Sequence, residues 1–251
     1  MTAETRPGLR SVGAGETPGE GPAYRLSDVI RVYREGEIET IALRGIDLEI
    51  PSGQFAAIIG RSGSGKSTLL NLLAAADRPT AGRVLFNGLD LARADEADRA
   101  ALRGRRIGIV FQGQNLVPFL SLAENVELGA AIADRPAGRA RIDELLDQVG
   151  LAGRARHRPE QLSGGEQQRA GLAAVLAAEP QVLLGDEITG ELDTESAELV
   201  LAAVADAHEQ RGVTVILVTH SPSVAERADR IVELRDGRIV GDASPARRTA
   251  Q

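Results

Sequence analysis

The sequence predicts an α/β protein with a mixed sheet flanked by helices, an antiparallel β subdomain and an inserted α-helical subdomain. Apolar runs that fit buried parallel strands recur at residues 55–60, 181–187 and 213–220. Stretches with helical spacing stand between them. Residues 24–50 alternate apolar with polar positions, as antiparallel strands do. Strands and helices that alternate along most of a chain are typical of α/β folds.

The length and composition predict one main domain. The chain has 251 residues and is 43% hydrophobic, which is enough to bury one substantial core. We therefore expect a single domain over residues 23–245, with the helical subdomain at about residues 113–180. Residues 1–22 are rich in Gly, Pro, Thr and Glu and predict a disordered tail, and residues 246–251 form a C-terminal tail.

Charge and composition exclude several classes of protein. The formal net charge is −7 and the arginines are scattered without basic runs, so no nucleic acid partner is expected. The absence of cysteine excludes disulfides, thiolate metal sites and a cysteine nucleophile, and it fits a cytosolic location. The start of the chain lacks a secretory signal, and no run reaches the roughly 18 apolar residues that span a bilayer, so no transmembrane segment is expected.

Local signals place the individual elements. Short strands are expected within residues 24–50, followed by a turn at residues 51–53. Residues 81–88 predict an edge hairpin, and residues 107–111 a further strand. The expected boundaries downstream are the capping box Ser121/Glu124, the helix ends Gly150 and Gly212, the N-cap Ser221 before Pro222, and the hairpin turn Asp236–Gly237.

A phosphate-binding loop is predicted where the first buried strand meets a helix. The stretch GRSGSGKST fits the Walker A pattern through Gly60, Gly65, Lys66 and Ser67. The alternative is a mere Gly/Ser turn, but the pattern follows an apolar strand and opens a helix, as phosphate binding requires. Lys66 is the only lysine in the chain, and a compact ammonium fits a ring of backbone amides better than a guanidinium does. Accident within an arginine-rich composition is the alternative for that choice.

Two further motifs complete the pattern. Asp186 and Glu187 end an apolar strand, where an acid can hold Mg²⁺ and its neighbour can polarise an attacking water, although such a pair can also be solvated loop charge. QLSGGEQQR places Ser163, Gly164 and Gly165 before a helical stretch, which makes a second phosphate-type nest. One Walker A loop needs no second nest, so we infer that the nest serves the nucleotide of another copy.

These motifs resemble those of the ATP-binding cassette (ABC) ATPases. GRSGSGKST, Phe111-Gln112, LSGGEQQR, VLLGDE, the segment 190–193 and His220 follow in family order over residues 24 to 240, approximately, and LSGGEQQR is nearly diagnostic. ETIALRGIDLEI and FQGQNLVPFLSLAENVEL resemble the subgroup that serves lipoprotein release, macrolide-type export and cell division. The resemblance implies the fold of a P-loop NTPase core.

The resemblance also implies roles for the residues that bind ATP. Tyr33 is expected to stack on adenine, with a buried or edge-strand tyrosine as the alternative. Ser67 is expected on Mg²⁺, and Thr68 supports the phosphates. The loop that cradles the phosphates comprises Gly60, Ser62, Gly63, Ser64, Gly65 and Lys66.

The same resemblance implies the catalytic groups. Gln112 is expected to contact Mg²⁺ and the attacking water, and Asp186 to hold the metal through its outer shell. Glu187 is the expected general base, and His220 contacts the γ-phosphate. Ser163, Gly164 and Gly165 are expected to act in trans on the partner's nucleotide, and Asp193 to lie at the seam of a homodimer.

Three positions depart from the family pattern. Ile188 replaces the usual proline after the glutamate, which predicts a looser segment and slower or less coupled hydrolysis. Ala174 stands where an arginine is usual, which predicts the loss of a salt bridge or of a contact to the neighbouring lobe. Ser221 replaces an aspartate, and both residues are good N-caps.

The resulting expectation is an ATP-hydrolysing subunit that powers a separate integral membrane permease from the cytoplasmic face of the cell's inner membrane. A non-transport ATPase that signals through a membrane partner, as in cell division, is the alternative, and the motifs do not separate the two. Chromosome-maintenance and ribosome-associated ABC proteins fit less well, because they carry long coiled coils or two cassettes. Small-molecule kinases and GTPases lack LSGGEQQR.

Overall fold

The central sheet carries the elements of the predicted α/β core. The computed structural model describes residues 21–113 and 115–244. Six strands lie in the order β10-β9-β3-β8-β7-β6, parallel except for the edge strand β10. They are β3 (Phe55–Ile59), β6 (Ile107–Val110), β7 (Val182–Asp186), β8 (Thr214–Val218), β9 (Arg230–Arg235) and β10 (Arg238–Ala243).

The second sheet is antiparallel and has the order β2-β1-β4-β5. Its strands are β1 (Tyr24–Glu35), β2 (Ile38–Ile50), β4 (Ala81–Phe86) and β5 (Leu89–Asp90). β1 and β2 pair along their whole length, so residues 24–50 form two long strands rather than the short ones expected. Register shifts in that ladder break the alternation of apolar residues, which explains why the sequence suggests shorter pieces.

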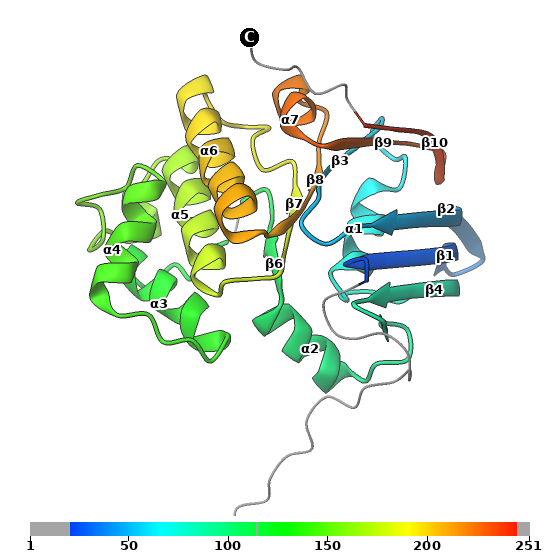
Figure 1. Ribbon diagram of the computed structural model, residues 1–251, viewed down its shortest axis with the longest axis horizontal. Coiled ribbons are helices and arrows are strands. Elements are labelled where there is room, and N and C mark those ends of the chain that lie inside the picture. The colour runs from blue at the N-terminus through cyan, green and yellow to red at the C-terminus, as the bar shows by residue number, and fades with distance from the viewer. Residues whose placement is uncertain (1–20, 114, 245–251) are drawn as a thin grey trace, which may run out of the picture.

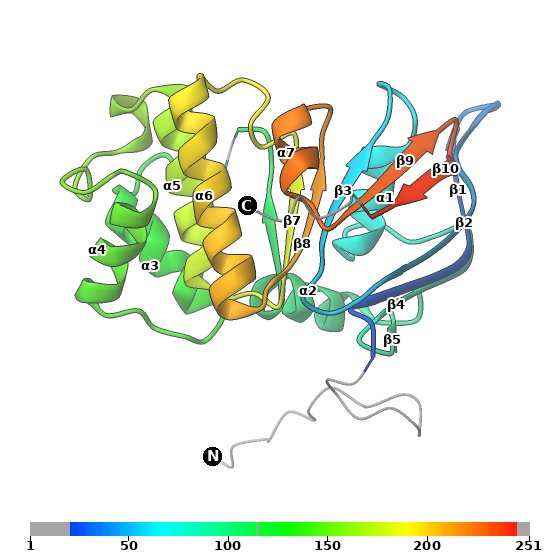
Figure 2. The same cartoon turned by 45° about the horizontal axis from the view of Figure 1, so that its top comes forward.

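The helices lie in distinct groups (Figure 1, Figure 2). α1 lies between the two sheets. α3, α4 and α5 form the helical subdomain, at the end of the molecule far from the antiparallel sheet. The bounds are α1 (Lys66–Leu73), α2 (Glu96–Arg105), α3 (Leu122–Ile132), α4 (Arg139–Gln148), the 3-10 helix η1 (Pro159–Gln161), α5 (Gly164–Ala177), α6 (Thr194–Arg211) and α7 (Pro222–Arg227).

Two hydrophobic cores cover the two faces of the central sheet. Successive side chains of a strand point to opposite faces, so neighbours such as Leu183 and Leu184 enter different cores. The first core joins the sheet to α5, α6 and the helical subdomain. The second joins it to the antiparallel sheet and to α1, whose Leu69, Leu70, Leu72 and Leu73 are all buried. α1 and α5 therefore lie on opposite faces of the central sheet.

Most of the predicted boundaries are confirmed. Ser121 and Glu124 form the capping box of α3, and Gly212 ends α6 in the left-handed conformation with φ +67°. Asp236 and Gly237 both have positive φ, the pattern of the hairpin turn that joins β9 to β10. Ser221 precedes α7, but its side chain makes no capping hydrogen bond, since its hydroxyl lies 2.8 Å from that of Ser223.

Helix α2 is absent from the sequence-based expectations. Its residues are mostly polar, and its buried side chains are Arg99 and Leu102, so the apolar stripe is too thin to be recognised. Asp95 accepts a hydrogen bond from the backbone N–H of Asp98 at 2.8 Å. That N-cap, together with the acidic residues Glu96 and Asp98 in the first turn, is the sequence signal that could have located the helix.

Candidate functional site

The loop between β3 and α1 is pressed against two neighbouring strands. Gly60 has φ +156°, and a Cβ there would lie 2.2 Å from the Leu234 carbonyl oxygen. Gly65 has φ +102°, and its Cβ would lie 2.5 Å from the Ala42 carbonyl oxygen. Both backbone and space therefore require glycine, which explains why the Walker A spacing is fixed. Ser62 and Gly63 are exposed at the loop, and Thr68 is half-buried on the helix that follows.

The interior of this loop carries the chemistry expected for an anion. Lys66 Nζ donates to the carbonyl oxygens of Gly60 at 2.8 Å and Arg61 at 3.0 Å, so the ammonium lies within the loop. The Ser64 hydroxyl is buried, with 4% of the residue exposed, and has no hydrogen-bond partner among the described residues. α1 begins at Gly65 without a side-chain cap, which leaves its first N–H groups available. Donors, a cation and a helix N-terminus converge there.

Two oxygen-bearing side chains meet beside the loop. The Ser67 hydroxyl donates to Asp186 Oδ2 at 2.8 Å, which joins the start of α1 to the end of β7. Hydroxyl and carboxylate oxygens are hard donors of the type that Mg²⁺ takes, together with water and phosphate oxygens. The described residues contain no group of three or more acidic, histidine or cysteine side chains that could hold a metal alone. The pair thus fits a cation shared with a phosphate ligand.

Glu187 and His220 form a polar pair at the ends of neighbouring strands. β7 and β8 are paired in parallel, and Glu187 N donates to the Val218 carbonyl oxygen at 2.9 Å. His220 Nδ1 lies 2.8 Å from Glu187 Oε1. The glutamate side chain is 19% exposed and the histidine 75% exposed, so the pair is half-sheltered with an open side. A carboxylate so placed can accept a proton from water while the imidazole holds its orientation.

Gln112 lies in a cavity that also reaches Glu187. The cavity has a volume of about 560 Å³ and lies between the residues after β6, the start of α5 and the turn after β7. Gln168 of α5 is buried and connects these parts, since its Nε2 donates to the Phe111 carbonyl at 3.0 Å and its Oε1 accepts from Gly113 N at 3.2 Å. Sequence reasoning missed Gln168, because nothing in the polar stretch GGEQQR marks one glutamine as buried.

The nest at the start of α5 is built as a capping box. Ser163 Oγ accepts from Glu166 N at 3.2 Å, and Glu166 Oε2 accepts from Ser163 N at 2.9 Å. This backbone N–H of Ser163 holds the pKa of the Glu166 carboxyl below its ordinary value. A Cβ at Gly164 would meet nothing within 4 Å, so the backbone there is open to a ligand. Because α1 and α5 cover opposite faces of the sheet, the phosphate loop and the nest begin helices that pack into different cores.

Asp193 begins the helix next to this nest. Its Oδ1 accepts from Ser196 N at 2.9 Å, and that hydrogen bond lowers the pKa of the Asp193 carboxyl. A Cβ at Gly165 would lie 3.0 Å from Ser196 Oγ and 3.6 Å from Leu192 Cδ2. The segment 190–193 therefore flanks the nest on one surface.

Tyr33 is held by its neighbours on β1 and by the loop after α1. Its hydroxyl donates to Asp77 Oδ2 at 2.9 Å, and Arg31 Nε donates to the same oxygen at 2.8 Å. The Arg31 guanidinium carbon lies 4.4 Å from the centre of the Tyr33 ring, a cation–π contact. Tyr33 is 38% exposed, so part of an ordered ring faces solvent. The predicted role in stacking remains a prediction.

The two other histidines lie outside this arrangement. His157 and His208 are both partly buried. His208 Nδ1 lies 3.2 Å from the Val213 carbonyl oxygen, and its ring meets the edge of Phe55 at a centroid distance of 5.8 Å. These contacts give His208 a packing role at the end of α6.

The fold and the loop together define a P-loop nucleotide-binding protein of the α/β class. A parallel sheet, a glycine-rich loop entering a helix, and an acidic pair at the adjoining strand end are the parts of that class. The chain belongs to the ABC transporter family, which its residues 43–190 match.

Similar proteins agree with this assignment. The lipoprotein-releasing system ATP-binding protein LolD of Anaeromyxobacter dehalogenans is 47% identical over 91% of this chain and 96% of its own length. The macrolide export ATP-binding/permease protein MacB of Azoarcus sp. is 45% identical over 96% of this chain, which spans only 36% of that protein. A solved dimer of the ATP-binding cassette MJ0796 bound to ADP and Pi has a TM-score of 0.83 and 37% identity, over 88% of this chain and 98% of the other.

Proposed function

We propose that this chain hydrolyses ATP as the nucleotide-binding subunit of an ABC transporter and drives a membrane permease on a separate chain. The pairing of Glu187 with His220 at 2.8 Å, beside the contact of Ser67 with Asp186, carries the proposal, because it supplies a base at a phosphate site. The match to LolD, over 96% of its length, supports the role of an ATP-binding component.

Nucleotide binding follows from the loop described above. The loop amides and Lys66 contact the phosphates. Ser67 and Asp186 would hold Mg²⁺, which, when bound, neutralises charge on the phosphate oxygens. The exposed face of Tyr33 offers a platform for adenine.

Hydrolysis then needs a positioned water and a proton acceptor. Glu187 accepts the proton as the water oxygen bonds to the γ-phosphorus, and the bond from that phosphorus to the β-γ bridging oxygen breaks, which yields ADP and inorganic phosphate. His220 keeps the carboxylate aimed at the water. Gln112 lines the same cavity and can hydrogen-bond the water from the other side.

A second copy completes each site. Within one chain the nest Ser163–Gly165 and the phosphate loop belong to opposite faces of the sheet, so the nest is free to cap a nucleotide held by another chain. Two copies packed head to tail would place two nucleotides between them, with Asp193 at the seam. ATP then favours the dimer and hydrolysis releases it. The dimeric assembly of MJ0796 supports this arrangement.

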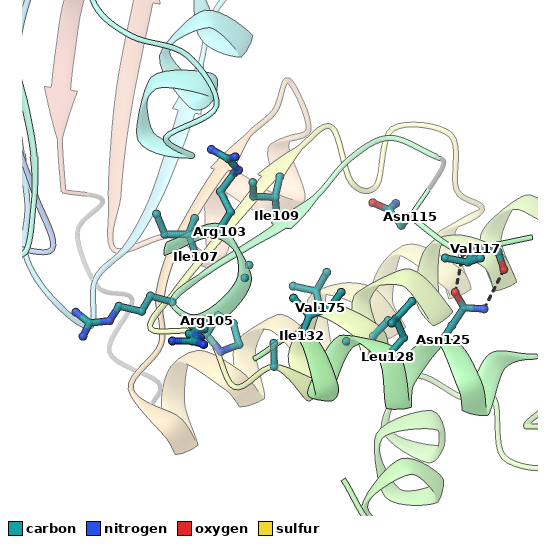
Figure 3. A pocket seen from close by; sticks show the side chains of 17 residues that line it. Arg103, Arg105, Ile107, Ile109, Asn115, Val117, Asn125, Leu128, Ile132 and Val175 are labelled. Atoms are coloured by element: carbon teal, nitrogen blue, oxygen red, sulfur yellow. Dashed lines mark hydrogen bonds between the residues drawn. The ribbon is translucent and has the colours of Figure 1, made fainter. Parts of the chain in front are cut away.

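A groove offers a place for the permease. It has a volume of about 300 Å³ and lies between the start of β6 and helices α3 and α5 (Figure 3). Leu128 and Ile132 line it and are 37% and 56% exposed, and Arg105, which forms an ion pair with Asp134, also belongs to the lining. A short apolar helix with an acidic end would suit this lining. Asn115 links the groove to the Gln112 segment, which gives a route between permease and site.

The membrane partner also fixes the proposed location. The described residues contain no helix long and apolar enough to cross a bilayer. We place the subunit at the cytoplasmic face of the membrane, bound through this groove.

The test separates binding from hydrolysis. Glu187→Gln keeps the phosphate contacts and loses the base, so it should bind Mg-ATP and accumulate dimers in size-exclusion chromatography. Lys66→Ala should lose ATP binding in calorimetry, and the exposed Glu209→Gln is the matched control that should behave as wild type. A Glu187→Gln protein that hydrolyses ATP at the wild-type rate would refute the role of this glutamate. Co-purification with a membrane subunit tests the partner.

A further inference from the structure

The backbone of the proposed base has an unusual conformation. Glu187 has φ +50°, which places a residue with a side chain in the left-handed region. Such a conformation persists only where the surroundings impose it. Glu187 N is held by the Val218 carbonyl, and Gly190 N donates to the Glu187 carbonyl at 3.0 Å, closing a turn over residues 187–190. The packing of neighbouring side chains must therefore keep the turn in this conformation.

Ile188 is the buried apolar residue of this turn. Ile188 is 3% exposed and belongs to the core shared by α5, α6 and the central sheet. It is the residue after the strained glutamate, so its burial fixes the peptide that leaves Glu187. An isoleucine is also stiff at χ1, which makes it a rigid anchor.

Gly185 provides the space for that side chain. A Cβ built at Gly185 would lie 2.8 Å from Ile188 Cγ2 and 2.7 Å from Leu217 Cδ2. Its φ is not in the left-handed region, so the requirement for glycine at this position is one of volume and not of backbone conformation. The glycine and the isoleucine are therefore complementary: one leaves the volume that the other fills.

We propose that Gly185 and Ile188 form a matched pair that positions Glu187, and this inference rests on the proposed function of Glu187 as base. Ile188 anchors the turn, the turn keeps Glu187 at positive φ, and that φ directs the carboxylate to His220. Isoleucine at the position where proline is usual in this family thus stabilises the segment by burial. The absence of proline predicts a looser segment, but the buried side chain of Ile188 would keep the turn over residues 187–190 in place.

The experiment compares four variants of the full chain in ATP turnover and ATP binding. Ile188→Ala should lower kcat by about tenfold with an unchanged Kd for ATP, because the loop that binds phosphate is untouched. Ile188→Val keeps the branched anchor and should stay within about threefold of wild type. Gly185→Ala should lower kcat like Ile188→Ala, since the added methyl displaces the isoleucine. The double variant Gly185→Ala/Ile188→Ala should lose no more activity than either single variant, because both changes disturb the same anchor.

A matched control removes the same atoms elsewhere. Ile142 of α4 is 4% exposed and lies in the same core, so Ile142→Ala should lower stability without lowering kcat. The split between kcat and Kd gives a second readout: Ile188→Ala should lower kcat at an unchanged Kd for ATP, whereas Ile142→Ala should change neither.

The outcomes separate this inference from the proposed function. Equal losses of kcat in Ile188→Ala and Ile142→Ala, or additive losses in the Gly185 and Ile188 variants, would overturn the matched pair. If Ile188→Ala does not fold, Gly185→Ala and Ile188→Val decide the question, and a Gly185→Ala protein with the wild-type kcat would overturn the matched pair. A Glu187→Gln protein that turns over at the wild-type rate would instead refute the assignment of the base.

Discussion

The turn between β9 and β10 supports the phosphate loop from outside the motif. Gly237 N donates to the Ser64 carbonyl at 3.0 Å, and Arg44 N donates to the Gly237 carbonyl at 2.8 Å, so this glycine joins the loop to β2. Gly237 has φ +75°, and a Cβ there would lie 2.6 Å from the Ala42 carbonyl oxygen. We therefore predict that Gly237→Ala weakens ATP binding although it contacts no nucleotide.

The expected loss of folding stability is the sum of two contributions. The left-handed backbone costs an alanine about 1–2 kcal/mol, and clearing the contact with the Ala42 carbonyl adds about 1 kcal/mol. A loss of about 2–3 kcal/mol should lower Tm by about 4–12 °C in a chain of this size. Displacement of the Ser64 carbonyl should raise the Kd for ATP by about tenfold, equivalent to about 1.4 kcal/mol.

The control is a second glycine that also has positive φ but has open space where a Cβ would lie. Gly153 has φ +80°, and a Cβ there would meet nothing within 4 Å, so Gly153→Ala carries the backbone cost alone. Circular dichroism gives Tm, and calorimetry gives the Kd for ATP. The reasoning fails if both variants lose the same stability and bind ATP equally well.

Three further predictions test other contacts. Asp77→Asn should weaken ATP binding by about threefold to tenfold and leave tripolyphosphate binding unchanged, because it loosens only the adenine platform; equal losses for both ligands would contradict this. Ser163→Ala and Ser121→Ala each remove a capping hydroxyl and should cost about 1 kcal/mol of stability, but only the first should abolish ATP-dependent dimers in size-exclusion chromatography. The hydrogen bond from Arg230 lowers the pKa of Asp242 below its ordinary value of 3.8, so the pair stabilises the fold above that value and the contribution is lost as the pH falls below it. With the carboxylate 43% exposed, the loss should be at most about 1 kcal/mol in denaturant titrations, and Asp242→Asn should remove this pH dependence.

Local chemistry explains which parts of the fold could be predicted. The caps of α3 and α6 and the turn at Asp236–Gly237 depend on neighbouring residues, so the sequence alone locates them. The pairing of β1 with β2 along their whole length depends on contacts between distant residues and on register shifts, which a local pattern does not contain. Helix α2 was not predicted, because much of its buried face is the aliphatic part of the Arg99 side chain.

In the candidate site, too, the features that depend on local sequence could be predicted, and the contacts between distant residues could not. The spacing of Gly60, Gly65 and Lys66 predicts a loop whose chemistry is local, and the structure adds the unpartnered hydroxyl of Ser64. The brace at Gly237 and the fit of Ile188 over Gly185 bring together residues that no single motif relates. Such contacts depend on the shape of the packed core, which the order of residue types does not specify.

The phosphate loop and the Ser163 nest begin helices on opposite faces of one sheet, and this has a consequence for mixtures of two inactive variants. A chain with Lys66→Ala keeps a sound nest, and a chain with Ser163→Ala keeps a sound loop. In the proposed head-to-tail dimer, each variant alone should assemble no working site, whereas a mixed pair would contain one site with both defects and one with neither. Two inactive proteins should thus restore part of each other's turnover when combined in one tube.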